Sequence, residues 1–189
     1  MGNVILIFVV TFVAIQLESK GSAFMKTLIL MRHAKSSWKD HEISDFERPL
    51  KKRGKKDAQA IAKLLVEKEL LPQKLVASSA KRARRTAEII IEDTKASCPV
   101  EYLDQLYMAE VPVYFDLLKS LPDDLERVMI IGHNPGLEGL VQVLSNQIES
   151  LPAGAMALIS VPVKSWKDLD SETKSDLIDL FKPKHEKEK

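Results

Sequence analysis

Two of the four histidines in this chain directly follow short apolar segments. His33 comes after residues 27–31 and Arg32, and His133 comes after the apolar run 128–131. A neutral imidazole is a nucleophile at neutral pH, because its reference pKa lies at about 6.5. A guanidinium binds phosphoryl oxygens through two parallel hydrogen bonds. A histidine beside an arginine therefore indicates chemistry on a phosphoryl group.

A second arginine follows a third apolar segment. Residues 75–77 precede Ser78 and Ser79, which can cap a helix whose first turn contains Arg82. The N-termini of this helix and of a helix after Pro135 would add backbone N–H groups for an anion. Phosphoryl transfer needs mainly positioning and charge stabilisation, and this set supplies both without a metal.

Neither a metal ion nor another cofactor is expected. Cys98 is the only cysteine, which excludes a multi-cysteine zinc site, and the sequence offers no ligand cluster with metal spacing. There are 28 Lys and Arg against 27 Asp and Glu, so the formal net charge is +1. The basic field typical of nucleic-acid-binding proteins is absent, and nucleic acid is not an expected partner.

Structural roles compete with catalytic ones at several positions. A single histidine at a strand end is more often a hydrogen-bonding group than a nucleophile. Arg84 and Arg85 fit solvated positions on a helix. The basic residues between Arg48 and Lys56 fit an exposed loop and helix start. As a functional feature, they would form a basic rim that attracts an anionic substrate.

Strand-like and helix-like patterns alternate along the chain. Short apolar runs predict strands at 27–31, 75–77, 100–103, 128–131 and 155–163. Apolar residues at helical spacing predict helices around 58–65, 83–90, 113–120, 137–144 and 177–181, whereas residues 39–56 are expected to be irregular. The alternation predicts an α/β fold, a three-layer α/β/α sandwich with a mainly parallel sheet. Ligands of such sheets bind beyond the carboxyl ends of strands, so both histidines and both arginines are expected in one crevice.

Length and composition predict one globular domain with an appendage. The chain has 189 residues, of which 45% are hydrophobic and 29% charged. We assign residues 25–184 to the domain and residues 185–189 to a charged tail.

The first 24 residues contain an apolar run from Val4 to Leu17. This run is shorter than the roughly 20 residues that span a bilayer. Residues 1–24 are interpreted either as a targeting segment or as an extension upstream of a start at Met25. The protein would be cytoplasmic in the second case and targeted or membrane-associated in the first. Membrane contact is expected only through residues 1–24.

Three motifs, each after a predicted strand, resemble those of the histidine phosphatase superfamily, whose fold is phosphoglycerate-mutase-like. They are Leu30-Met31-Arg32-His33-Ala34-Lys35, Arg82-Ala83-Arg84-Arg85-Thr86-Ala87 and Gly132-His133-Asn134-Pro135-Gly136. Further features resemble the small SixA-like phosphohistidine phosphatases: Ala34, the loop Asp45-Phe46-Glu47-Arg48-Pro49-Leu50 with Arg53-Gly54, and Trp166 with the closing Phe181-Lys182-Pro183-Lys184. The resemblance covers about residues 25–184.

The resemblance implies a role for each matching residue. His33 would take the phosphoryl group as a covalent phosphohistidine. The rest of the phosphate pocket would be Arg32, Arg82 and His133. Ser36 matches a small hydroxyl residue that often follows the first motif, and Arg48 would reach the pocket or brace it.

Larger members of the superfamily also place a glutamate to protonate the leaving oxygen. Alignment on Tyr107 puts Asp104 near that place, with Glu110 as the second choice. A phosphohistidine substrate reduces the need for an acid, because imidazole leaves more easily than an alkoxide. The short segment 100–121 has no room for the large helical insert of the mutases, which implies an open, shallow site.

The resulting interpretation is a metal-independent phosphatase that acts through a phosphohistidine enzyme intermediate and removes phosphate from phosphohistidine on proteins. A phosphatase of small phosphomonoesters is the second choice. A phosphate-binding module without turnover is an alternative from a different class. The partner is accordingly a phosphorylated protein or a small phosphorylated substrate.

Overall fold

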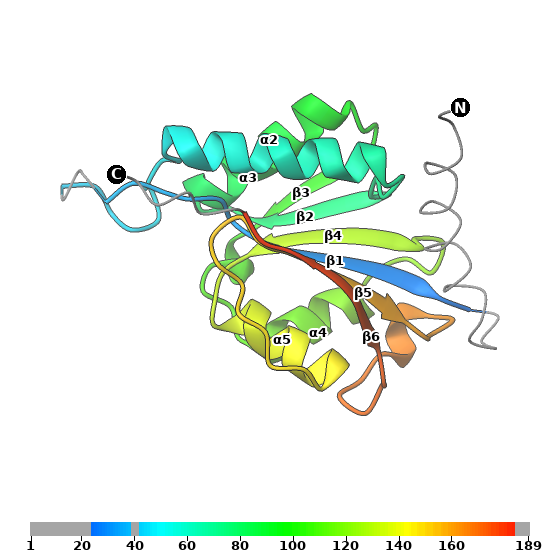
Figure 1. Cartoon of the computed structure of the whole chain (residues 1–189). Coiled ribbons are helices and arrows are strands. Elements are labelled where there is room, and N and C mark those ends of the chain that lie inside the picture. The colour runs from blue at the N-terminus through cyan, green and yellow to red at the C-terminus, as the bar shows by residue number, and fades with distance from the viewer. Residues whose placement is uncertain (1–23, 39–41, 184–189) are drawn as a thin grey trace, which may run out of the picture.

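The computed structural model describes residues 24–38 and 42–183, which are built around a six-stranded sheet (Figure 1). The strands are β1 (Lys26–Arg32), β2 (Lys74–Ser78), β3 (Val100–Leu103), β4 (Arg127–Gly132), β5 (Met156–Val161) and β6 (Asp176–Phe181). Their order across the sheet is β3-β2-β4-β1-β5-β6. Residues 1–23 of the predicted N-terminal segment and the predicted tail 185–189 lie outside the described residues.

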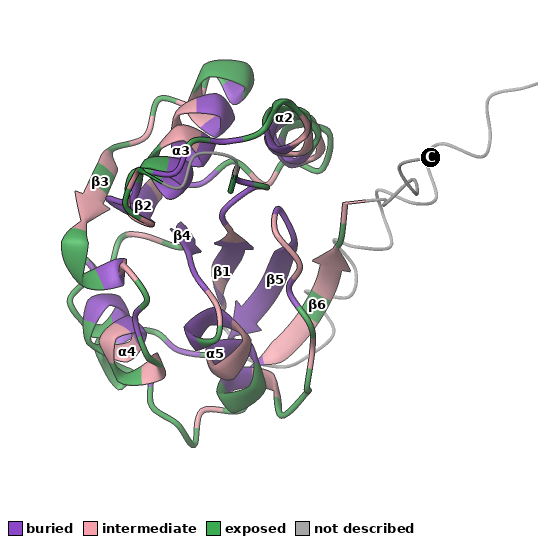
Figure 2. Ribbon diagram, turned by 90° about the vertical axis from the view of Figure 1, so that its left-hand side faces the viewer, coloured by how far each residue is buried: buried purple, intermediate pink, exposed green. Residues whose placement is uncertain are grey.

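Four neighbouring strands of the sheet are parallel. These are β3, β2, β4 and β1, and β5 and β6 extend the sheet through antiparallel pairs. Parallel strands covered on both faces need continuous apolar sequences, and β4 is buried throughout from Val128 to Gly132. Figure 2 shows that burial is concentrated in the central strands β1, β4 and β5. The carboxyl ends of β1, β2 and β4 therefore meet at one edge of a rigid sheet.

Helices cover both faces of the sheet (Figure 1). Helices α2 (Lys52–Glu67) and α3 (Lys81–Thr94) pack on one face, and α4 (Val111–Lys119) and α5 (Gly136–Ser145) pack on the other. The residues whose helical spacing predicted α2 are all buried: Ala58, Ile61, Ala62 and Leu65. The predicted three-layer α/β/α sandwich with a mainly parallel sheet is confirmed.

The predicted last helix at residues 177–181 is wrong. This segment is strand β6, which pairs antiparallel with β5 at the edge of the sheet. Leu177 and Phe181 are separated by four residues, a spacing that fits one face of a helix and also one face of a strand. Pairing with β5 provides partners for the backbone of the segment, so the sheet edge decides between the two structures.

Two local expectations around the site are also corrected. The residue that precedes α3 is Ala80, and no side chain caps this helix, because the hydroxyls of Ser78 and Ser79 bond to other partners. Helix α2 begins at Lys52, so the second half of the segment predicted to be irregular is partly helical.

In the part of the chain that the structure describes, every helix is too short or too polar to cross a bilayer.

Candidate active site

The pairing register of β1 and β4 brings the two predicted histidines together. Arg32 pairs with Gly132, and the backbone N–H of His33 donates to the carbonyl of Gly132 at 3.1 Å. His33 and His133 are thus the next residues beyond the paired ends of two neighbouring strands, and their ring centroids lie 5.0 Å apart. Ser78 ends β2 on the other side of β4. Three strand ends therefore contribute to one site.

His33 is held with the lone pair of Nε2 facing the site. Its Nδ1 lies 2.9 Å from the carbonyl oxygen of Ala34, and because that oxygen can only accept, Nδ1 carries the ring proton. Nε2 accepts a hydrogen bond from Nε–H of Arg82 at 3.1 Å. Burial, together with the positive charges of Arg82 and Arg32, lowers the pKa of His33 to about 3. The ring is therefore neutral and nucleophilic at neutral pH.

His133 is anchored by a side chain. Its Nε2 lies 2.9 Å from Oγ of Ser78, and its Nδ1 lies 3.3 Å from Nη2 of Arg82. Because a guanidinium can only donate, Nδ1 accepts, and Nε2–H donates to the serine hydroxyl. Burial lowers the pKa of His133 to about 4, and the charge of Arg82 adds to the effect. Both histidines are thus neutral when the pocket holds no phosphoryl group.

Arg82 connects the two histidines to a third group. Its side chain is only 3% exposed, and its Nε and Nη2 face the rings of His33 and His133. Nη1 and Nη2 also donate to the main-chain oxygen and to Oδ2 of Asp45, at 2.5 and 2.9 Å. Four of the five N–H groups of the guanidinium are therefore used by these bonds.

Thr86 joins α3 to the end of β1. Its hydroxyl accepts from the backbone N–H of Ala34 at 3.1 Å and donates to the carbonyl of Arg82 at 2.7 Å. This attachment determines which side chains of α3 face the site. Arg84 is exposed and lies 4.5 Å from the ring centre of Tyr102, outside the pocket. Arg84 is therefore solvated, as the helical periodicity predicts, while Arg82 faces the site.

Arg32 is positioned by the loop after α5. Its Nη1 donates to the carbonyl of Leu151 at 2.9 Å, and the same carbonyl accepts from Nδ2 of Asn134 at 2.9 Å. The backbone N–H of Leu151 donates to Oε1 of Glu138 at 2.8 Å, which holds this carbonyl in place. Nε of Arg32 and Oδ1 of Asn134 are buried, and neither is hydrogen-bonded within the described residues.

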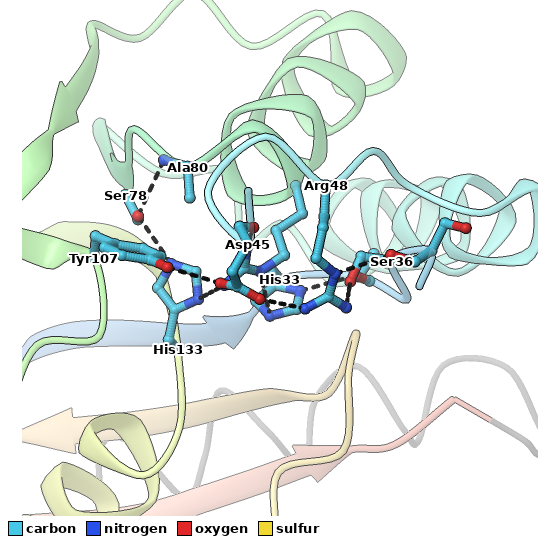
Figure 3. Close-up of polar contacts among 11 residues, drawn as sticks. His33, Ser36, Asp45, Arg48, Ser78, Ala80, Tyr107 and His133 are labelled. Atoms are coloured by element: carbon cyan, nitrogen blue, oxygen red, sulfur yellow. Dashed lines mark hydrogen bonds and ion pairs between the residues drawn. The ribbon is translucent and has the colours of Figure 1, made fainter. Parts of the chain in front are cut away.

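The segment between β1 and α2 contributes Ser36, Asp45 and Arg48 to the polar contacts of the site (Figure 3). Arg48 donates from Nη2 to Oγ of Ser36 at 2.7 Å and from Nη1 to Oδ1 of Asp45 at 2.5 Å. The hydroxyl of Tyr107 donates to Oδ2 of Asp45 at 2.7 Å. Burial raises the pKa of Asp45, but hydrogen bonds from Tyr107 and the two arginines outweigh it and lower the pKa to about 2. Asp45 is therefore a carboxylate.

The start of α2 packs against the segment that follows His33. The backbone N–H of Lys51 donates to the carbonyl of Lys35 at 2.9 Å. A Cβ on Gly54 would lie 2.2 Å from the same carbonyl oxygen, so this position requires glycine. The close approach explains the glycine of the Arg53-Gly54 pair.

These side chains line an open pocket of about 440 Å³. Six of the seven predicted site residues line it: Arg32, His33, Ser36, Arg48, Arg82 and His133. Asp104 does not, because it lies on the short helix η1 (Asp104–Leu106), is exposed, and accepts a hydrogen bond from the hydroxyl of Ser79. Its position offers no support for the predicted role as the acid. Of the carboxylates in residues 24–38 and 42–183, the one that lines the pocket is Asp45.

Comparisons of the sequence lead to a known family. A family model described as histidine phosphatase superfamily (branch 1) matches residues 28–109. An uncharacterised chloroplastic protein of Arabidopsis thaliana is 30% identical over 159 residues, which are 79% of this chain and 73% of that protein. An uncharacterised protein of Mycobacterium tuberculosis is 30% identical over 151 residues, which are 74% of this chain and 92% of that protein. The chain belongs to the histidine phosphatase superfamily.

Solved structures of SixA proteins share the fold of this histidine phosphatase. The protein from Nakamurella multipartitia has a TM-score of 0.75 at 25% identity, covering 86% of this chain and 98% of its own. The protein from Agrobacterium tumefaciens has a TM-score of 0.73 at 24% identity, covering 85% of this chain and 100% of its own. The predicted SixA-like histidine phosphatase is confirmed, and the protein is a phosphohydrolase.

Asp45, Ser78 and Tyr107 belong to the site of this histidine phosphatase but are absent from the predicted set of site residues. Asp45 opens the loop motif that contains Arg48, so the motif itself was a signal for it. Tyr107 was only a reference point for alignment. Ser78 was assigned to a helix cap, and no local pattern could indicate that its hydroxyl faces His133 from a neighbouring strand.

Proposed function

We propose that this histidine phosphatase removes phosphate from phosphohistidine on proteins, without a metal ion, through a phosphoryl intermediate on Nε2 of His33. The observation that carries the proposal is the neutral, buried ring of His33, whose unprotonated Nε2 faces a pocket lined by three arginines and a second histidine. One solved structure with this fold belongs to the protein histidine phosphatase SixA in complex with tungstate, which supports the substrate class.

In the first step, Nε2 of His33 attacks phosphorus while the bond from phosphorus to the leaving group breaks. The proton on Nδ1 remains bonded to the carbonyl of Ala34, which stabilises the positive charge that the ring acquires. Arg32 and Arg82 offer N–H groups to the equatorial phosphoryl oxygens and balance their charge. His133 becomes a further donor to these oxygens.

In the second step, water attacks phosphorus and the bond to Nε2 of His33 breaks. The products are inorganic phosphate and the neutral ring, which again carries its proton on Nδ1. The same arginines stabilise both transition states, because the equatorial oxygens occupy the same place in each.

The mouth of the pocket favours a substrate attached to a protein. The side chains of Trp38 and Met108 line it and are 64% and 51% exposed. The guanidinium of Arg48 lies 3.2 Å from the ring centre of Trp38, so this apolar rim is held beside the phosphate-binding groups. An open rim of this kind admits a side chain presented by another protein.

The test is a panel of substrates offered to the full-length enzyme. A histidine-phosphorylated protein labelled with ³²P is compared with phosphomonoesters of several sizes, and rapid quenching is used to trap label on the enzyme. We expect the highest kcat/KM on the phosphohistidine protein and label that is stable in alkali and absent in His33→Ala. A preference for one phosphomonoester would favour the second choice of substrate. Activity without label on His33 would contradict the covalent route.

Turnover is expected to persist in excess EDTA, because two arginines supply the charge that a cation would otherwise provide. Loss of activity in EDTA that is restored by a divalent metal would contradict the proposed mechanism.

A further inference from the structure

Asp45 places a negative charge in a pocket otherwise built to bind an anion. Its carboxylate accepts from Arg48 at 2.5 Å, from Arg82 at 2.9 Å and from the hydroxyl of Tyr107 at 2.7 Å (Figure 3). Among the described residues that line the pocket, it is the only acidic one. A carboxylate beside a phosphoryl group repels it, so Asp45 opposes phosphate binding while it holds Arg48 and Arg82 in place.

The position of Asp45 points to the leaving group. The side chain of Asp45 is 39% exposed, whereas that of Arg82, which contacts His33, is 3% exposed. Asp45 therefore lies on the outer side of Arg82. An in-line attack by His33 places the leaving group on the side of phosphorus opposite to Nε2, which is the side that faces the opening.

The surrounding contacts can hold Asp45 there after a phosphoryl group has engaged Arg82. Arg48 is fixed by Oγ of Ser36 at 2.7 Å and by the carbonyl of Ser37 at 2.9 Å, independently of Arg82. Tyr107 donates to Oδ2 from the other side. If phosphoryl oxygens take over the Nη2 donor of Arg82, Oδ2 of Asp45 gains the capacity to accept from another N–H group.

We propose that Asp45 is a specificity-determining residue that accepts a hydrogen bond from a protonated nitrogen leaving group and so selects N-phosphoryl over O-phosphoryl substrates. This inference rests on the proposed function and deepens it. The substrate enters with its leaving nitrogen or ring already protonated. When the P–N bond breaks and the bond from Nε2 of His33 to phosphorus forms, the electron pair of the P–N bond neutralises the leaving group. No proton has to come from the enzyme, which fits a pocket in which Asp45, the one acidic residue among the described lining residues, is ionised.

The experiment measures how one substitution changes the ratio of two activities. The kcat/KM values for phosphoramidate, whose nitrogen is protonated at neutral pH, and for p-nitrophenyl phosphate, whose leaving oxygen is not, are determined for full-length wild type and Asp45→Asn. We expect the ratio of phosphoramidate to p-nitrophenyl phosphate activity to fall by about tenfold or more, because Asn keeps the shape but loses the charge. Asp45→Glu should retain most of the preference for phosphoramidate.

Glu47→Gln is the matched control. Glu47 lies in the same loop and pairs with Lys81 at 3.4 Å, but it does not line the pocket. The same change of charge there should leave the ratio unchanged. Tyr107→Phe removes one donor to Asp45 and should move the ratio in the same direction as Asp45→Asn but by less.

The outcomes separate this inference from the proposed function. Equal losses on both substrates in Asp45→Asn would overturn the inference, as would a wild type that hydrolyses p-nitrophenyl phosphate but not phosphoramidate. A wild type that is inactive on a histidine-phosphorylated protein would overturn the proposed function, while the ratio measured on the two small substrates would still decide the role of Asp45.

Discussion

His33 and His133 follow the paired ends of two neighbouring parallel strands, but their ring protons are held by different kinds of partner. Nδ1–H of His33 donates to the backbone carbonyl of Ala34, and Nε2–H of His133 donates to the hydroxyl of Ser78. A carbonyl can only accept, so the tautomer of His33 is the same whatever occupies the pocket. A serine hydroxyl can accept or donate, so it supports either tautomer of His133.

The difference matches two different tasks. A permanent lone pair on Nε2 suits the residue that attacks phosphorus. His133 accepts from Arg82 in the structure, but it must donate when a phosphoryl oxygen replaces the guanidinium. If the hydroxyl of Ser78 turns to donate to Nε2, the ring proton of His133 can move to Nδ1. The two histidines are therefore expected to respond differently to substitution and to pH.

The largest effect is expected at His33 itself. His33→Ala should lower kcat by about a thousandfold or more, because no neighbouring group can replace the nucleophile. Steady-state kinetics should be paired with circular dichroism to verify the fold. His133→Ala is the comparison: it should turn over slowly and still become labelled by ³²P. Retention of more than a few per cent of activity in His33→Ala would mean that another residue attacks phosphorus.

The next largest effect is expected at the arginine that contacts both rings. Arg82→Lys keeps the charge but removes the planar fork, and a loss of about 2–4 kcal/mol of transition-state stabilisation is expected. That corresponds to a fall of about 30- to 1,000-fold in kcat/KM. Arg84→Lys, two residues along the same helix, should change kcat/KM by less than about threefold. Similar small effects in both variants would show that Arg82 does not bind the phosphoryl group.

A pH dependence of stability follows from the two neutral rings. Folding lowers the pKa of His33 to about 3 and that of His133 to about 4, whereas the unfolded chain has ordinary histidines. The unfolded state therefore binds more protons below a pH of about 6.5, and the free energy of unfolding should decrease as pH falls. At a pH of about 5, each ring should lower the free energy of unfolding by about 2 kcal/mol relative to its value at neutral pH. Urea denaturation at both pH values should show a smaller decrease in His33→Asn and His133→Asn than in wild type; an unchanged decrease would contradict the assignment.

The smallest effect is expected where a side chain, and not the backbone, holds a ring. Ser78→Ala removes the partner of Nε2 of His133 and should lower kcat/KM by about tenfold, the value of one buried hydrogen bond. Ser78→Thr keeps the hydroxyl and should retain more activity if the added methyl is accommodated. Nitrogen chemical shifts of the two rings provide the decisive readout: Ser78→Ala should shift the Nε2 resonance of His133, which loses its hydrogen-bond partner, and leave both nitrogens of His33 unchanged. A change at both rings would indicate a general disturbance of the site.

The sequence alone determined which strand ends carry the chemistry. His33 and His133 each follow an apolar run long enough to be a buried strand, and parallel strands align their carboxyl ends at one edge. Helical periodicity likewise separated Arg82 from Arg84, because a difference of two residues turns a side chain by about 200° around a helix. These features depend on local spacing, which a sequence displays directly.

The groups that complete the site depend on contacts between distant parts of the chain. Asp45 reaches Arg82 across 37 residues, and Tyr107 reaches Asp45 across 62, distances in sequence at which no periodicity applies. Ser78 bonds to His133 because β2 lies next to β4 in the sheet, although local spacing favours a helix cap. Segment 176–181 became a strand because the edge of β5 offered backbone partners. In each case a polar group had more than one possible partner, and the packed sheet determined which one was within reach.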